Sequence, residues 1–311
     1  MRNQPGFDRS RSPVGGTPPP AWPFPQQYDT SVPPVAERES ELTAGFPIEP
    51  GRTYGFFTDT TVCIGCKACE VACKEWNNLP ADAVEFQATS YDNTRSLGHS
   101  TWRHVKFIEQ PPPSGGEARW LFLSDICKHC EHAGCLEACP TGAIIRTEFG
   151  TVVIQQDICN GCKYCVPSCP YGVITTDDLG DGKAHKCTLC YDRLKGGLEP
   201  ACAKACPTDS IQFGPIEELR ARAQARLEAL HRQGFTEARL YGALDGLGAT
   251  HGIKSLQSFF LLMDHPNVYG LPEAPRLPAR NIVPGAIASL VGVVLMVGAT
   301  VLALLGGGKE R

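Results

Sequence analysis

Several kinds of functional segment are missing from this chain of 311 residues. It has no glycine-rich dinucleotide fingerprint, no phosphate-binding P-loop and no obvious catalytic triad. It also has no long basic run, and its formal net charge is −4, so nucleic-acid binding is poorly supported. The sequence therefore offers no substrate site of these kinds and no reason to expect a nucleic-acid partner.

Hydrophobic periodicity is scarce in the first 50 residues, which are rich in proline, glycine, serine and charge. They contain neither an apolar h-region nor a twin arginine, so they do not have the form of a usual signal peptide. We expect residues 1–50 to form an extended or disordered arm. Two roles stay open for it: wrapping a partner, or no attachment at all.

Charge is absent from Ile282 to Gly308. As a helix, the stretch from Val283 to Leu305 would span roughly 34 Å at about 1.5 Å per residue, enough for a bilayer core of roughly 30 Å. We therefore expect residues 281–308 to form one transmembrane helix in contact with the lipid bilayer. Basic residues flank it on both sides, so charge counting gives no orientation. Small residues that permit close helix packing are Gly285, Ala288, Ser289 and Gly292.

Cysteine, in contrast, is abundant, and all sixteen cysteines fall into four groups of four. A secreted disulfide scaffold needs no such order. Zinc ribbons favour C-x2-C pairs separated by a longer spacer, which does not explain three close cysteines followed by C-x3-C. The run from Cys159 to Pro170 reads C-x2-C-x2-C-x3-C-P, the bacterial ferredoxin pattern for a [4Fe-4S] cluster. The pattern therefore predicts iron–sulfur clusters.

The other three groups vary this spacing. Group one lacks the proline, group two widens its middle spacer to four residues, and group four has eleven residues between its second and third cysteines. The fourth cysteine of a ferredoxin group ligates the neighbouring cluster. This crossover rule predicts four [4Fe-4S] clusters, at sites that we name A to D. Site A would use Cys63, Cys66, Cys69 and Cys206; site B, Cys73, Cys187, Cys190 and Cys202; site C, Cys127, Cys130, Cys135 and Cys169; and site D, Cys139, Cys159, Cys162 and Cys165.

An internal repeat follows three of the groups. Thr141-Gly142-Ala143-Ile144 is echoed by Tyr171-Gly172-Val173-Ile174 and, after Pro207, by Thr208-Asp209-Ser210-Ile211. This duplication indicates pseudo-twofold symmetry. The predicted fold class is α+β, with two pseudo-symmetric double-cluster ferredoxin-like modules and one C-terminal transmembrane helix.

The domain organisation follows from this repeat. Groups one and four would form an outer module that encloses the inner module of groups two and three. We expect short strands at Tyr54–Asp59 and, within an insertion over residues 77–118, at Thr101–Phe107. Residues 215–233 have the pattern of an amphipathic helix, with Leu219, Ala223, Leu227 and Leu230 facing the core. The predicted segments are the arm at 1–50, the outer module at 51–125 and 180–214, the inner module at 126–179, a helix and linker at 215–280, and the membrane helix at 281–308.

Two histidines in the insertion, His99 and His104, are candidate ligands, although ordinary surface or packing roles explain them more simply. A cubane cluster held by four cysteines moves one electron and offers no open iron to a substrate. The chain is therefore predicted to be a non-catalytic electron-transfer protein. A non-redox scaffold with structural clusters is the competing class.

From about residue 54 to 305, the chain resembles the beta, iron–sulfur subunit of membrane-bound respiratory formate dehydrogenases. The cysteine framework alone is shared with electron-transfer subunits of dimethyl sulfoxide, polysulfide and nitrate reductases and of some hydrogenases. Nitrate reductase relatives have a tryptophan where Cys162 stands, and the long N-terminal arm departs from the family. The runs that carry the resemblance are Cys63–Cys69, Trp102–Phe107, Ser124–Cys130, Arg146–Val152 and Lys186–Arg193.

This resemblance implies a complex in a cytoplasmic membrane. A catalytic alpha subunit with a molybdenum- or tungsten-bis(molybdopterin guanine dinucleotide) centre would oxidise formate, and this chain would pass the electrons to a cytochrome b gamma subunit that reduces quinone. The cluster domain would lie on the periplasmic side, exported with a catalytic partner that bears the twin-arginine signal. The alternative is the equivalent subunit of another molybdopterin oxidoreductase or of a membrane-bound hydrogenase.

Overall fold

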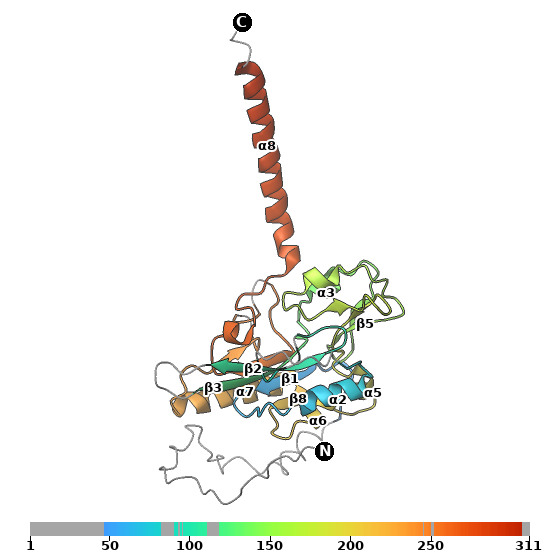
Figure 1. Ribbon diagram of the computed structural model, residues 1–311, viewed down its shortest axis with the longest axis vertical. Helices are drawn as coiled ribbons and strands as arrows, with labels where there is room; N and C mark the ends of the chain where they lie inside the picture. The colour runs from blue at the N-terminus through green and yellow to red at the C-terminus, as the bar shows by residue number, and fades with distance from the viewer. Residues whose placement is uncertain are drawn as a thin grey trace, which may run out of the picture.

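A computed structural model describes residues 47–81, 90–92, 94, 96–110, 118–244, 246–249 and 252–306. The predicted N-terminal arm, residues 1–50, lies outside the described residues except for its last four. The described chain forms a folded body from which one long helix, α8 (Ile282–Gly306), projects (Figure 1).

A four-stranded sheet lies at the centre of the body, in the order β8-β1-β10-β9. Strand β1 (Tyr54–Asp59) pairs in parallel with β10 (Ser258–Leu262) and in antiparallel with β8 (Ile211–Pro215), and β9 (Arg239–Tyr241) lies antiparallel to β10. All residues of β1 and β10 are buried, as expected for central strands covered on both faces. The predicted strand at Tyr54–Asp59 is confirmed.

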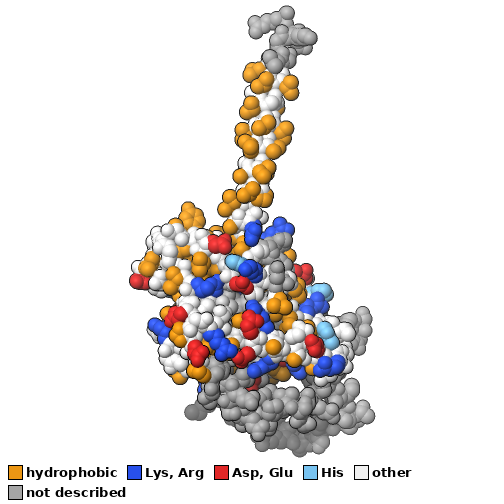
Figure 2. Space-filling view, turned by 180° about the vertical axis from the view of Figure 1, so that it is seen from behind, with side chains coloured by type: hydrophobic (Ala, Val, Ile, Leu, Met, Phe, Trp, Pro, Cys, Tyr) orange, Lys and Arg blue, Asp and Glu red, His pale blue; other side chains and the backbone are white. Residues whose placement is uncertain are grey.

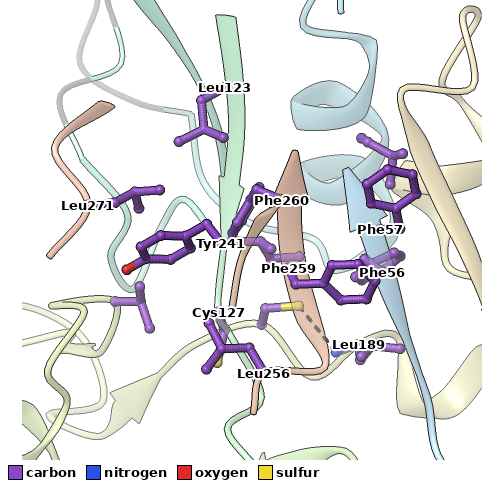
Figure 3. Close-up of a cluster of buried hydrophobic side chains, with 14 of the residues drawn as sticks. Phe56, Phe57, Leu123, Cys127, Leu189, Tyr241, Leu256, Phe259, Phe260 and Leu271 are labelled. Atoms are coloured by element: carbon purple, nitrogen blue, oxygen red, sulfur yellow. Dashed lines mark hydrogen bonds between the residues drawn. The ribbon is translucent and has the colours of Figure 1, made fainter. Parts of the chain in front are cut away.

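The hydrophobic core is built around β1 and β10. Phe57 stacks on Phe259 with ring centroids 5.4 Å apart. Figure 3 shows these strands side by side, with Cys127 and Leu256 at the edge of the same apolar cluster. The core therefore reaches the cysteines directly, and the sheet is the platform on which the cysteine loops are held.

Helix α7 (Ile216–Arg232) packs on β1, within one residue of the predicted span. Leu219, Ala223 and Leu230 are buried, and Leu227 is partly buried, so the predicted core face is confirmed. Acidic residues occupy the first turn, where the helix dipole favours them.

The chain between groups one and two contributes a second sheet of two antiparallel strands, β2 (Arg103–Gln110) and β3 (Arg119–Ile126). The predicted strand at Thr101–Phe107 corresponds to β2. Phe107 and Phe122 face each other across the pair, with ring centroids 4.9 Å apart. The first residue of β2, Arg103, lies opposite Ile126 and is buried.

The predicted internal repeat has a counterpart in the backbone. Gly142 (φ 69°), Gly172 (φ 63°) and Asp209 (φ 51°), each three residues after the last cysteine of a group, are all in the left-handed region. A strand begins shortly after each turn. Antiparallel pairs follow groups two and three, namely β4 (Ile144–Arg146) with β5 (Val152–Ile154), and β6 (Thr175–Thr176) with β7 (Ala184–His185).

Short helices carry or flank most of the cysteine groups, and two 3-10 turns precede α8. They are α2 (Ala68–Trp76), α3 (Gly134–Glu137), α4 (Cys165–Ser168), α5 (Tyr191–Lys195), α6 (Ala201–Lys204), η1 (Pro266–Tyr269) and η2 (Pro278–Asn281). Helix α5 fills part of the eleven-residue spacer of group four.

Helix α8 is long and apolar enough to cross a membrane, since an 18-residue window within Pro278–Leu304 has a mean hydropathy of 2.5. Figure 2 shows hydrophobic side chains along the helix, while charged side chains lie on the body. At the foot of α8, η2 contacts α3, and Gly134 of α3 lies close against Leu277 and Pro278. In Figure 1, α3 and β5 lie beside this foot, whereas α2, α5 and α6 lie on the far side of the body.

Candidate metal centres

The first two cysteines of every group are joined by the same turn. The residue before the second cysteine has a positive φ in all four groups: Gly65 (66°), His129 (43°), Gly161 (71°) and Leu189 (58°). Glycine adopts this conformation freely, whereas His129 and Leu189 are strained in it. A strained backbone kept in groups two and four indicates that the loop geometry itself is required.

The third and fourth cysteines are placed by short helices. The third cysteine lies near the start of α2, α3, α4 or α6, and in three groups the fourth lies just after the helix and is followed by proline. Cys73 is the exception, because no proline follows it and α2 continues to Trp76. In the other three groups the fourth cysteine thus lies beyond the helix, away from the two cysteines of the leading turn.

Site C is assembled from two sequence groups. The three leading cysteines of group two line one hollow together with Cys169 of group three. Burial and the negative charges of Cys127, Cys169 and Cys135 raise the pKa of the Cys130 thiol well above its usual value. The structure therefore brings together the four cysteines predicted for site C.

Site D mirrors this arrangement. Cys139 of group two lines a second hollow with Cys159, Cys162 and Cys165. Burial, together with the charges of these neighbours, raises the pKa of Cys165 to about 11. The structure thus places the fourth cysteine of each inner group beside the three leading cysteines of the other group.

Sites A and B pair groups one and four in the same way. Burial and the charge of Cys206 raise the pKa of Cys63, which places Cys206 at site A. Burial and the charges of Cys202 and Cys190 raise the pKa of Cys73, which places Cys73 at site B. Each fourth cysteine again lies with the other group.

Neighbouring cysteines link the four sites in a single order. Cys69 of site A lies near Cys202 of site B, and Cys187 of site B lies near Cys127 of site C. Cys135 of site C in turn lies near Cys165 of site D. These neighbouring pairs indicate the order A, B, C, D across the body, from the α2 side to the side beside α8.

Hydrogen bonds to sulfur differ between the sites. The Leu189 N–H donates to Cys187 Sγ at 3.2 Å, and Ser124 Oγ lies 3.3 Å from Cys69 Sγ. Burial opposes ionisation of Cys139, but bonds from the Thr141 hydroxyl and nearby backbone N–H groups lower its pKa. Donors of this kind stabilise a negatively charged sulfur.

Unpaired buried donors test whether iron–sulfur clusters fit these sites. His129 lines the site C hollow, and its Nδ1 accepts the Val152 N–H at 3.1 Å. The ring proton therefore belongs on Nε2, which is buried without a protein partner. Arg103 Nε and Nη2, beside sites A and B, are likewise buried without one. Cluster sulfides would supply the missing acceptors, so the residues fit the cofactor.

A single metal ion has no comparable site among the described residues, since no three Cys, His, Asp or Glu side chains converge closely enough to hold one. The two candidate histidines have other contacts. His104 Nε2 lies 2.6 Å from Asp92 Oδ2, and His99 Nε2 lies 3.8 Å from Asp177 Oδ1. The structure thus places neither histidine ring with the cysteines, which fits the packing role.

Comparison with known proteins agrees with this picture. A family described as a 4Fe-4S dicluster domain matches residues 118–216, and a second family of the same description matches residues 62–143. Together they span all sixteen cysteines. The chain is thus an iron–sulfur protein with two 4Fe-4S dicluster domains, and the predicted fold class is confirmed in these domains, in its mixed helices and strands and in its long apolar C-terminal helix.

More specific relatives are subunits of formate dehydrogenases and of a dimethyl sulfoxide reductase. The chain is 41% identical over 221 residues to the iron–sulfur subunit of the nitrate-inducible formate dehydrogenase of Escherichia coli, covering 70% of this chain and 72% of that protein. It is 40% identical to the formate dehydrogenase iron–sulfur subunit of Haemophilus influenzae, covering 70% and 68%. The B subunit of the Escherichia coli anaerobic dimethyl sulfoxide reductase is 35% identical over 190 residues, covering 60% and 86%. The chain therefore belongs to the family of formate dehydrogenase iron–sulfur subunits.

Proposed function

We propose that this chain relays electrons within a membrane-bound formate dehydrogenase complex. It would take them from a catalytic subunit that oxidises formate at a molybdenum or tungsten centre and deliver them to a cytochrome b subunit that reduces quinone. The succession of sites A to D carries the proposal, because it connects opposite sides of the body. Four [4Fe-4S] clusters, held by the sixteen cysteines in the crossover sets, supply one-electron transfer when bound.

The two ends of the succession are suited to partner proteins. At site A, Cys66 is exposed, and Ile64 and Val71 beside it are exposed apolar side chains. At site D, Cys162 and Tyr164 are exposed. Apolar side chains around an otherwise buried cofactor site are typical of interfaces. We assign the site A end to the catalytic partner and the site D end to the membrane partner.

The position of α8 supports this direction. Its foot contacts α3, which carries Cys135 of site C. If α8 crosses the membrane, sites C and D lie nearest the bilayer and sites A and B lie farthest from it. The family resemblance supports a periplasmic position for the body.

One alternative has specific support. The dimethyl sulfoxide reductase relative is covered over 86% of its length, so a reductase complex with the opposite direction of electron flow is the second candidate. The shared cysteine framework alone does not separate the two functions.

The experiment that separates them uses the complex solubilised from membranes with this chain intact. We expect the large partner to be a formate-oxidising subunit, and formate to give the electron paramagnetic resonance signals of reduced [4Fe-4S] clusters within the chain. A partner that reduces a sulfoxide, with signals produced by a quinol and abolished by the sulfoxide, would instead establish the alternative.

A further inference from the structure

Buried carboxylates in the described chain are each matched by a basic side chain. Asp125, for example, is paired with Lys128 and with Lys106. The other pairs are Asp59 with Arg226 at 2.9 Å, Glu70 with Lys67 at 3.3 Å, and Glu199 with Lys204 at 3.7 Å. Buried acidic charge is therefore neutralised by the chain itself.

Arg103 breaks this rule. Its side chain is fully buried, with 1% of its surface exposed, yet no carboxylate of the described residues lies within ion-pairing distance. Nη1 donates to Ser124 Oγ at 2.9 Å, and the guanidinium lies over the Phe56 ring, 4.9 Å from its centroid. Burying an uncompensated charge is strongly unfavourable. A negative group other than a carboxylate must therefore lie nearby.

The surroundings of Arg103 identify that group. Four cysteines, Cys202, Cys69, Cys187 and Cys73, lie near enough to the buried guanidinium for negative charge on their sulfurs to stabilise its positive charge. Cys69 belongs to site A, and the other three belong to site B. The guanidinium is thus a fixed positive charge at the junction of these two sites.

Ser124 extends this charge to one sulfur. Because Ser124 Oγ accepts a hydrogen bond from Arg103, its own hydroxyl proton is free to donate to Cys69 Sγ, 3.3 Å away. A hydroxyl polarised by a cation is a stronger donor. The Arg103–Ser124 pair therefore acts on site A through a defined hydrogen bond and on site B through the guanidinium itself, which lies beside Cys202.

We propose that Arg103 sets the reduction potentials of the clusters at sites A and B, raising both above the values they would have without it. Adding one electron makes a cluster more negative by one charge, with no bond broken and no proton needed. A fixed positive charge favours that reduced state. The proposal rests on the ligand sets of the proposed function.

Lys186 is a second buried cation, at the junction of sites B and C. It is buried, without a carboxylate partner among the described residues, and it donates to the carbonyl oxygens of Val152 and Cys187. Its charge acts on Cys135 of site C. Because these carbonyl oxygens already accept its hydrogen bonds, Lys186 is less dependent on a cluster than Arg103.

The test is an anaerobic redox titration of the whole complex, followed by electron paramagnetic resonance. The variants are Arg103→Gln, which removes the charge; Arg103→Lys, which keeps it; Ser124→Ala; and Arg232→Gln, an exposed arginine at the end of α7, as the control. Cys66→Ser and Cys190→Ser identify the signals of sites A and B. The iron content of each variant is measured in parallel.

We expect Arg103→Gln to lower the potentials at sites A and B and to leave the potential at site D unchanged. Arg103→Lys should keep most of the wild-type values, Ser124→Ala should lower site A more than site B, and Arg232→Gln should change neither. Should Arg103→Gln lose the clusters of sites A and B, retention of those clusters in Arg103→Lys would equally support charge compensation.

Three results would overturn the proposal: unchanged potentials in a fully loaded Arg103→Gln complex, equal shifts at all four sites, or an Arg103→Lys variant that behaves like Arg103→Gln. A wild-type complex without clusters at sites A and B would have a different meaning, because it contradicts the ligand sets of the proposed function whatever the Arg103 variants do.

Discussion

Sites B and D have the same four-cysteine chemistry in opposite surroundings. The cysteines of site B are all buried, none more than 5% exposed, whereas at site D only Cys165 is buried and Cys162 is exposed. Site B also lies beside an uncompensated buried arginine, whereas two short strand pairs and backbone hydrogen bonds surround site D. Burial, nearby charge and hydrogen bonds to sulfur tune a cluster whose ligands are identical.

The difference in burial between sites B and D fits their positions in the relay. A link in the middle of a relay gains from exclusion of water and oxidants, because it exchanges electrons only with its neighbours in the relay. A terminal link must approach a partner protein, so some of its surface stays exposed until the complex forms. The same motif therefore serves both purposes, and the surrounding fold makes the difference.

Removing one cysteine ligand at site B and one at site D should give the largest difference between a middle site and an end site of the relay. Cys73→Ser should interrupt the relay at site B and reduce formate-dependent quinone reduction to background. Cys162→Ser should also impair quinone reduction, but formate should still reduce the clusters at sites A to C. Iron analysis and electron paramagnetic resonance of the purified complexes, after addition of formate, measure both effects.

The control is Thr188→Ala, which lies within a cysteine loop but replaces no proposed ligand. If Cys73→Ser still allows formate to reduce site D at the normal rate, electrons bypass site B, and the linear order is wrong.

Removing the C-terminal tail should impair the membrane end of the relay and leave the formate end intact. Deletion of residues 281–311 leaves every cysteine in place, since none lies beyond Cys206. We expect all clusters and formate oxidation with an artificial dye to survive, because the dye accepts electrons without the membrane partner. Quinone reduction and membrane attachment should fall.

A milder change to α8 is the double substitution Gly285→Leu and Gly292→Leu. It keeps the helix apolar but fills two positions that are open for close helix packing. Quinone reduction should fall less than after deletion. A truncated complex that stays on membranes and reduces quinone at the full rate would show that α8 is not an anchor of consequence.

Exposure to air should destroy the cluster at site D before the cluster at site B. Site D should lose its cluster several-fold faster than site B, because oxidants reach exposed iron and sulfide first. Quenching samples at intervals and following the separate resonance signals gives both rates. Equal rates in the isolated chain would mean that the difference in burial does not control access.

The smallest expected effect concerns a contact that involves no cysteine side chain. Burial favours the protonated form of Asp92, but its bonds with His104 and Lys67 lower its pKa on balance. It therefore stabilises the fold above the unfolded pKa of about 3.9, and this contribution is lost as the pH falls through the lower folded value. Asp92→Asn should cost about 1 kcal/mol and lower Tm by about 2–4 °C at neutral pH.

Thermal unfolding of wild type and variant at several pH values measures this difference, which should shrink in acid. Asp178→Asn is the matched control, because the exposed pair of Asp178 with Lys163 should contribute little. An unchanged Tm for Asp92→Asn would show that the contact adds no stability.

Local patterns in the sequence predicted the cysteine groups, β1, β2, α7 and the long apolar helix. They did not predict β10, because Ser258–Leu262 is a short apolar run in a mixed segment and its partner β1 is about 200 residues earlier in the chain. The segment 215–280, expected to be helix and linker, thus also completes the central sheet. Strand β3 was also missed, although its partner β2 lies only a short connection earlier in the chain.

Arg103 was the least accessible to sequence reasoning. An arginine at the start of a strand ordinarily faces water, and nothing in the run Trp102–Phe107 shows which cysteines will surround it. Its burial depends on contacts with groups one and four, which come together only in the folded chain. The crossover ligand sets, in contrast, follow from spacing and a general rule.

The most direct test of the central claim is an anaerobic experimental structure of the loaded complex, with iron located by anomalous scattering. The account predicts four [4Fe-4S] clusters in the order A, B, C, D, with Cys73 on the cluster of group four and Cys139 on the cluster of group three. A structure in which each sequence group closes its own cluster would contradict it.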